Sequence, residues 1–140
     1  MKVIVAGGRD FVSKAGGEVE AEMLMAKGLK EFYDSNDLDK EPTLICGMAR
    51  GADLMAKQIF EKEGLEVIER PADWKDMSEP CVRRHNDYGE YNAMAGIKRN
   101  HAMGDEADIL IAFWSGKSKG TKDMIDYMRT LGKPAYIYRY

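Results

Sequence analysis

The chain has 140 residues, 44% of them hydrophobic and 32% charged, which is enough for one domain with a real core and ordinary for a globular protein. Its net charge of −3 disfavours a general nucleic-acid-binding surface, and no apolar run approaches the roughly 18 residues of a membrane span. Two cysteines make no disulfide framework, and the first apolar stretch is too short for a signal peptide. We therefore expect a single cytoplasmic domain over residues 1–140.

Strand-like and helix-like segments alternate along the first half of the chain. Residues 2–6 are continuously apolar, which predicts a strand buried on both faces, and 16–33 follow with apolar residues at helical spacing. After a polar connector we expect a strand over 43–46 and a helix over 51–63. Residues 65–69 are more alternating, which predicts a strand nearer an edge of the sheet.

The second half continues this alternation beyond one irregular segment. Residues 70–91 show no clean period, and so long a loop in a compact domain is usually functional or partly disordered. Within it, Trp74 could stack on a base or cover the edge of the core. Beyond it we expect a helix over 92–106, a strand over 108–114, a loop over 115–121, a helix over 122–131 and a strand over 134–138. The alternation predicts an α/β fold with a five-stranded parallel sheet and right-handed crossovers.

Residues 43–53 run from a predicted buried strand through a glycine-flanked turn into a helix. We expect Gly47 and Gly51 to take positive φ and to let a ligand approach closely. The first amides of the helix and the guanidinium of Arg50 would then favour an anion, most often phosphate. The alternative is an ordinary turn in which Arg50 is solvated and Asp53 is a carboxylate at the helix start.

Glycine-containing loops follow the first, second and fourth predicted strands. Because the carboxyl ends of parallel strands share one edge of the sheet, these loops should converge where open α/β sheets bind ligands. Five cations should approach that edge: Arg9, Arg50, Arg99, Lys117 and Lys119. A positive site in a chain of net charge −3 indicates a small anionic ligand, and the alternative is that these cations are scattered over the surface.

Several familiar chemistries lack their motifs in this chain. Gly7-Gly8-Arg9 is not G-x-G-x-x-G, and the 115–121 loop lacks the Gly-Lys-Ser/Thr ending of a Walker A loop. These absences disfavour a dehydrogenase or an ATPase, and we predict no cofactor. Cys46 lies in a predicted strand with no base at hand, which disfavours a nucleophile. Cys81 and His85 are two possible ligands and do not make a metal site, so we predict no metal.

Five motifs occur in a specific order: Gly7-Gly8-Arg9-Asp10-Phe11, Gly47-Met48-Ala49-Arg50-Gly51-Ala52-Asp53, Pro71-Ala72-Asp73-Trp74, Ala95-Gly96-Ile97-Lys98-Arg99-Asn100, and Phe113 through Gly120-Thr121 with Met124-Ile125. Together they resemble the YspA/YpsA-related branch of the SLOG superfamily, relatives of the DprA/Smf and LOG proteins, over residues 2–138. The resemblance implies a Rossmann-like three-layer fold, a nucleotide or nucleotide-derived ligand, and self-association.

The resemblance also implies that the three glycine-containing loops line the ligand pocket. Together with the convergence of the loops, it gives the ligand-binding residues that we expect: Gly7, Gly8, Arg9, Asp10, Gly47, Arg50, Gly51, Asp53, Asp73, Trp74, Arg99, Asn100, Ser115, Gly116, Ser118, Lys119, Gly120 and Thr121.

Two features depart from the LOG pattern. Residues 99–103 are similar to the R-K-x-x-M motif of LOG phosphoribohydrolases, but the glutamate of their second motif is replaced by Met124. A thioether cannot act as a base, so the inference of N-glycosidic hydrolysis is weakened, although Met124 is compatible with the YspA-like branch. Residues 75–92 are longer than expected and could be a lid, a partner surface or an inert insertion.

Three function classes follow from these observations. The leading hypothesis is a binding module or sensor for a nucleotide-like phosphate ligand at the carboxyl edge of the sheet. Its rival is an enzyme acting on a nucleotide-type substrate, with Asp10, Asp53 or Asp73 supplying the missing carboxylate. Binding of single-stranded DNA is a third class, disfavoured by the acidic balance.

Methionines suggest a contact surface. Met23, Met25 and Met128 lie on predicted helices that carry apolar residues over more than one face. Exposed apolar patches usually mark contacts, so we expect a homo-oligomer, in the first place a two-fold dimer. The alternative is that these methionines fill gaps in the core of a monomer.

Overall fold

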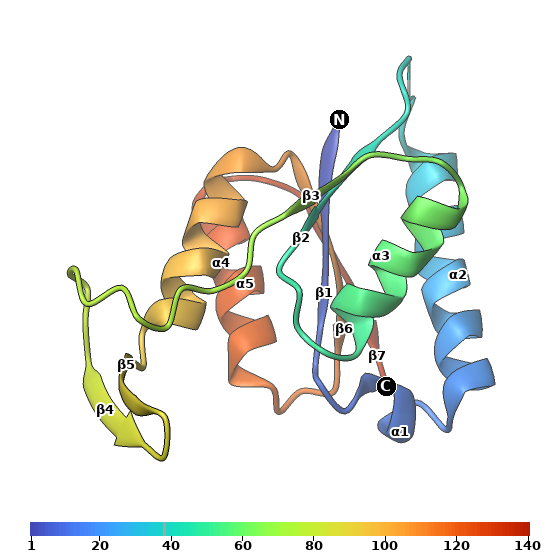
Figure 1. Cartoon of the computed structure of the whole chain (residues 1–140). Helices are drawn as coiled ribbons and strands as arrows, with labels where there is room; N and C mark the ends of the chain where they lie inside the picture. The colour runs from blue at the N-terminus through green and yellow to red at the C-terminus, as the bar shows by residue number, and fades with distance from the viewer. Residues whose placement is uncertain (38) are drawn as a thin grey trace.

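The computed structural model describes residues 1–37 and 39–140. Its centre is a five-stranded, all-parallel sheet in the order β3-β2-β1-β6-β7 (Figure 1). The strands are β1 (Lys2–Gly7), β2 (Thr43–Cys46), β3 (Val67–Glu69), β6 (Ile109–Trp114) and β7 (Ala135–Arg139). The α/β class and the five strands predicted from the sequence are confirmed, and β3 is an edge strand as expected.

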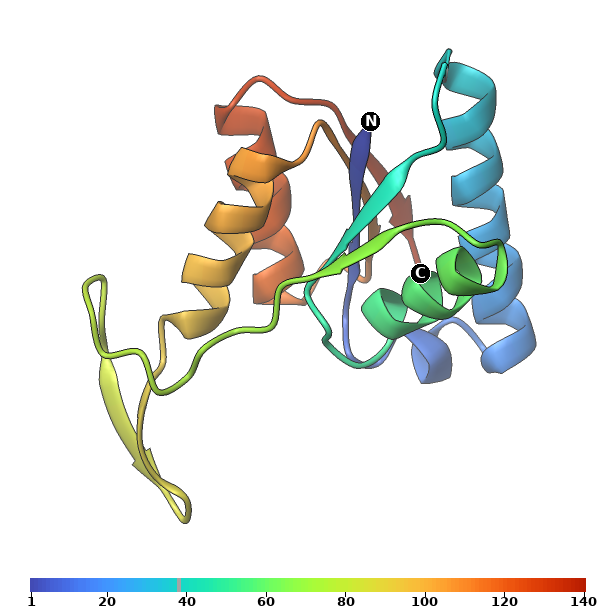
Figure 2. The same ribbon diagram turned by 45° about the horizontal axis from the view of Figure 1, so that its top comes forward.

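Helices cover both faces of the sheet and make three layers (Figures 1 and 2). One face carries α1 (Phe11–Lys14), α2 (Glu18–Ser35) and α3 (Ala52–Lys62), and the other carries α4 (Ala95–Glu106) and α5 (Lys119–Thr130). Successive strand residues point to opposite faces, so Val3 and Val5 pack under α2 and α3, whereas Ile4 packs under α4 and α5. Burial on both faces explains the continuous apolar runs of β1, β2 and β6.

The segment expected to lack regular structure contains a β-hairpin. It consists of β4 (Arg83–Asn86) and β5 (Gly89–Asn92), joined by residues 87–88. The side chain of Asn86 accepts a hydrogen bond from Tyr88 N at 2.9 Å, and Gly89 takes a φ of +106°. The periodicity gave no signal because β4 is exposed throughout, and a strand without a buried face needs no apolar alternation.

Two predicted boundaries near the ligand edge were wrong. The helix expected over 92–106 begins at Ala95, because Asn92 ends strand β5. The loop expected over 115–121 is shorter, since Lys119, Gly120 and Thr121 form the first turn of α5. This second shift matters for function because it places the start of a helix where we expected a loop.

Two of the three methionines expected at a contact surface lie in the core. Met25 and Met128 are fully buried, and only Met23 of the three named side chains is exposed, at 67%. Buried helices are apolar on more than one side where they also pack against neighbouring elements, and Met25 and Met128 fill such positions.

Within the described residues, none of the helices combines the length and apolar character needed to span a bilayer.

Candidate functional site

A cleft of about 570 Å³ opens at the carboxyl ends of β1 and β6. These two strands are neighbours in the sheet; β2 and β3 follow on the side of β1, and β7 follows on the side of β6. The cleft therefore lies at the topological switch point of the sheet. Its lining comes from the loops after β1, β2 and β6, from the first turns of α3, α4 and α5, and from the segment that leads into the hairpin. The predicted convergence of loops on one edge is confirmed in this geometry.

Most of the expected ligand-binding residues line this cleft: Gly7, Gly8, Arg9, Asp10, Asp53, Trp74, Arg99, Asn100, Ser115, Ser118, Gly120 and Thr121. Six others are not part of its lining: Gly47, Arg50, Gly51, Asp73, Gly116 and Lys119. The prediction omitted seven lining residues: Ala6, Ala49, Ala93, Gly96, Ile97, Lys117 and Met124. Four of the seven lie in motifs already singled out (Ala49, Gly96, Ile97 and Met124), and Lys117 is one of the cations expected at this edge. Ala6 and Ala93 are small and carry no chemical signal of their own.

The start of α5 supplies donors to the cleft. Ser118 caps the helix, because its Oγ accepts a hydrogen bond from Thr121 N at 3.3 Å and contacts Thr121 Oγ1 at 3.0 Å. The first intrahelical bond runs from Lys122 N to Ser118 O at 3.1 Å. The amides of Lys119 and Gly120 precede it and have no intrahelical partner, and Gly120 lines the cleft at the positive end of the helix dipole.

Arg99 projects from α4 across the end of β2. Its Nη1 donates to the carbonyl oxygen of Gly47, and its Nε donates to Asn100 Oδ1 at 3.2 Å. Asn100 in turn donates to Gly120 O at 3.1 Å and to Asp123 Oδ2 at 3.2 Å. Burial lowers the pKa of Arg99, while the nearby Asp53 carboxylate raises it. The guanidinium is therefore oriented by protein oxygens before any ligand arrives.

Asp53 is the buried carboxylate of the cleft, only 7% exposed. Its Oδ2 accepts a hydrogen bond from Ala49 N at 3.3 Å. Burial raises its pKa to about 6, against the opposing effects of backbone amides and of Arg99. An amide of the turn before α3 thus already donates to a carboxylate at the helix start. This agrees with the alternative expectation for residues 43–53, in which Asp53 is a carboxylate at the start of the helix.

The turn after β2 uses its glycines differently from the prediction. Gly51 has a φ of +88°, as expected, but the other positive φ belongs to Met48, at +65°, and not to Gly47. Gly47 is required for space instead, because a Cβ there would lie 2.9 Å from Asp53 Oδ2 and 3.1 Å from Arg99 Nη1. The close approach allowed by Gly51 is to the loop after β1, at Gly8 O.

The carboxylates considered for catalysis separate in space. Met124, the residue that the resemblance matches to the LOG glutamate, lines the cleft. Asp10 lines the cleft and accepts a hydrogen bond from Tyr140 Oη at 2.9 Å, whereas Asp73 lies outside it and accepts from Lys75 N at 3.2 Å. Of the three candidates, Asp10 and Asp53 remain at the cleft.

The sequence raised Cys46 as a possible nucleophile, and Cys81 with His85 as possible metal ligands. Cys46 is buried in β2, and burial raises the pKa of its thiol to about 11, which leaves it protonated and a poor nucleophile. Among the residues that the structure describes, no group of three or more His, Cys, Asp and Glu side chains could hold a metal ion.

No protein-family model matches the chain, and no curated protein matches it either. The resemblance to the SLOG superfamily therefore stays a prediction that rests on the five motifs, whereas the α/β fold with a parallel sheet is a direct property of the structure.

Proposed function

We propose that this protein binds a nucleotide or nucleotide-derived phosphate ligand in the cleft at the carboxyl ends of β1 and β6. The observation that carries the proposal is the convergence of donors on one space. The start of α5 and the side chains of Arg9, Arg99 and Lys117 all line the same cleft. Such a combination of free helix amides and cations favours a phosphate group.

A binding role is favoured over catalysis because the cleft lacks the glutamate of LOG enzymes. The rival is an enzyme acting on the same class of ligand, and one observation supports it. Asp53 is buried at the cleft with a pKa of about 6, which suits a general base near neutral pH. The two roles differ in what happens to the ligand after it binds.

Calorimetric titration with nucleoside monophosphates and dinucleotides tests the binding role. Arg99→Ala should weaken binding by about 1.5–3 kcal/mol, the value of a hydrogen bond to a charged group. Arg50→Ala is the matched control, since Arg50 is exposed and outside the cleft, and its effect should be smaller. Failure of the wild-type protein to bind any member of the panel would contradict the proposal.

Asp53→Asn separates the binding module from the enzyme. For a binding module, removing a negative charge from the cleft should preserve or strengthen the binding of an anion. For an enzyme that uses Asp53 as a base, the same variant should lose turnover while it still binds. Chromatography of the incubated ligands measures turnover, and enzyme-like rates in the wild type would replace the binding role with the catalytic one.

A further inference from the structure

One wall of the cleft is apolar and is not used by the core. It is formed by Trp74, Ala93, Gly96 and Ile97, which we call the apolar wall. Trp74 and Ile97 belong to neither of the two core clusters, and Trp74 is 40% exposed. The indole therefore does not cover a core edge, which was the alternative role for this tryptophan. A large aromatic ring left open at the cleft is available for contact with a ligand.

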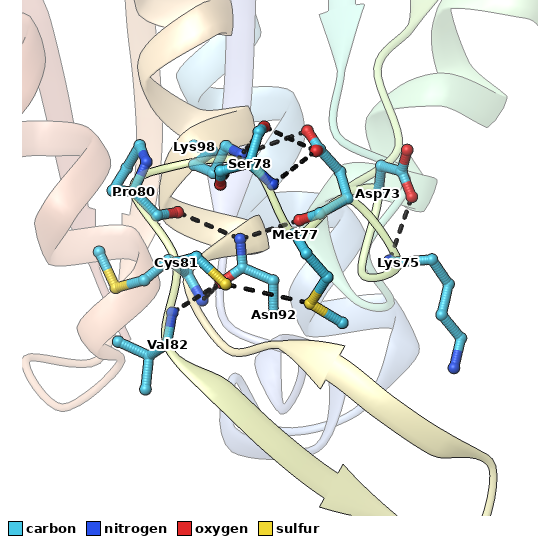
Figure 3. Close-up of polar contacts among 11 residues, drawn as sticks. Asp73, Lys75, Met77, Ser78, Pro80, Cys81, Val82, Asn92 and Lys98 are labelled. Atoms are coloured by element: carbon cyan, nitrogen blue, oxygen red, sulfur yellow. Dashed lines mark hydrogen bonds and ion pairs between the residues drawn. The ribbon is translucent and has the colours of Figure 1, made fainter.

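The backbone of Trp74 is held by the end of the hairpin. Asn92 N donates to Trp74 O at 2.7 Å, and Asn92 itself is completely buried. Its side chain satisfies four backbone groups: Oδ1 accepts from Val82 N and Met94 N at 3.1 and 2.9 Å, and Nδ2 donates to Asp76 O and Pro80 O at 3.0 and 3.1 Å. Figure 3 shows this amide at the centre of the segment, so one residue joins both ends of the hairpin to Trp74.

A lysine on α4 ties the same segment to the body of the protein. Lys98 Nζ donates to Asp76 Oδ2 at 3.2 Å and to Ser78 O and Oγ at 2.9 and 3.0 Å (Figure 3). Hydrogen bonds from Ser78, with help from Lys98, lower the pKa of Asp76 to about 2, so this tie persists at neutral pH. The Tyr91 ring meets the indole of Trp74 edge-on, with the centroids 6.2 Å apart.

We propose that the indole of Trp74 stacks on the aromatic base of the bound nucleotide, and that residues 75–92 are a brace that positions this indole. The inference rests on the proposed function and deepens it, because it names a nucleoside monophosphate as the ligand class. It also gives a role to the long segment whose purpose the sequence left open.

The spacing along α4 fits a ligand of this class. A Cβ on Gly96 would lie 3.6 Å from Cη2 of Trp74, and one turn further on Asn100 donates to Gly120 O at the start of α5. Four residues of α-helix rise about 6 Å. A pentose ring joins a base to a phosphate over a comparable length, so a nucleotide can place its base on the apolar wall and its phosphate at the start of α5.

The test compares a nucleoside 5′-monophosphate with ribose 5-phosphate, which has the same sugar phosphate and no base. Trp74→Ala should weaken nucleotide binding about 5- to 150-fold, the range found for stacking of one base, and should leave ribose 5-phosphate unaffected. Trp74→Phe should restore most of the loss. Tyr88→Ala is the control, because Tyr88 is an aromatic residue 89% exposed at the hairpin turn and should change neither affinity.

Lys98→Met tests the brace. The variant keeps most of the aliphatic side chain and removes the ammonium group that donates to Asp76 and Ser78, and Lys98 does not line the cleft. It should weaken nucleotide binding in the same base-selective way as Trp74→Ala, and by a smaller factor. If the wild type binds nucleotides while Trp74→Ala reduces both ligands equally or neither, the stacking role is wrong and the proposed function stands. If Lys98→Met leaves nucleotide affinity unchanged, the brace is wrong. If the wild type binds no nucleotide, both the proposed function and this inference are wrong.

Discussion

The carboxylate of Asp53 and the guanidinium of Arg99 face one another across Gly47. Asp53 Oδ2 and Arg99 Nη1 lie 2.9 and 3.1 Å from the position that a Cβ on Gly47 would occupy. The two groups come from different helices, α3 and α4, on opposite faces of the sheet. Both groups can approach this point only because Gly47, directly after β2, has no side chain.

Gly47→Ala should therefore disturb the cleft and the fold together. The added methyl group has to displace the carboxylate, the guanidinium or both, and overpacking of this kind costs about 1–3 kcal/mol. Chemical denaturation measures the loss of stability, and calorimetry measures the accompanying loss of phosphate-ligand affinity. Gly120→Ala is the control for stability, because no heavy atom lies within 4 Å of a Cβ there and its φ is not positive. Unchanged stability in Gly47→Ala would contradict the crowding described above.

Asp53→Asn should alter the pH dependence of stability. The pKa of Asp53 is raised from 3.8 to about 6, so the folded protein holds this proton more tightly than the unfolded chain. The contribution of Asp53 is most favourable below pH 4 and becomes less favourable as the pH rises through 6. At 1.36 kcal/mol per pKa unit, the full change is on the order of 3 kcal/mol.

An asparagine does not titrate and can still accept the hydrogen bond from Ala49 N. The variant should gain about 2–3 kcal/mol relative to the wild type between pH 4 and pH 7.5. Urea denaturation of both proteins at pH 4 and pH 7.5 gives the stability of the variant relative to the wild type at each pH. A stability gap that is the same at both values would show that Asp53 is not the buried, destabilising charge described here.

Gly120 should show opposite effects on stability and on binding. It lies in the first turn of α5, has no positive φ, and has no heavy atom within 4 Å of its Cβ position. A side chain at Gly120 therefore meets neither backbone strain nor a steric clash within the protein. Gly120→Ala should raise stability by up to about 1 kcal/mol, since alanine is the better helix former.

The same methyl group should enter the cleft, because Gly120 lines it. Ligand affinity should then fall in Gly120→Ala, fall further in Gly120→Val, and fall less in Lys119→Ala, whose side chain is outside the lining. Thermal denaturation and calorimetry on the three variants check the two directions. Normal binding by the valine variant would mean that the ligand does not approach the start of α5.

The exposed apolar surface that could support self-association is smaller than the sequence predicted. Val19 and Met23 are 65% and 67% exposed and lie one turn apart on α2. We expect a two-fold dimer through this face, and Met23→Lys should dissociate it. Light scattering at tens of micromolar protein measures the mass, and a wild-type value of 15.8 kDa would end the prediction.

The framework of the fold could be predicted because its signals are local. Val3 to Val5, Leu44 to Cys46 and Ile109 to Phe113 are buried on both faces of a parallel sheet, so each strand is a continuous apolar run. Once the strands are parallel, the loops after β1, β2 and β6 must emerge at one edge, and the position of the cleft follows. Gly51 likewise marked a turn that does require a positive φ.

The details of the site were decided by contacts between distant residues. Arg99 and Gly47 are 52 positions apart and meet only when α4 packs on the sheet. The hairpin, the buried Asn92 and the open face of Trp74 had no local signal, because exposed strands need no apolar period and an asparagine reveals nothing of its burial.

The sequence alone therefore determined the layers, the strands and the edge at which the loops meet, because hydrophobic burial imposes its period on neighbouring residues. The tertiary structure alone decided that Met25 and Met128 are core residues, that Asp53 is buried beside Arg99, and that Trp74 faces the cleft. These facts depend on which helix packs against which strand, and a side chain carries no local mark of the neighbour it will meet.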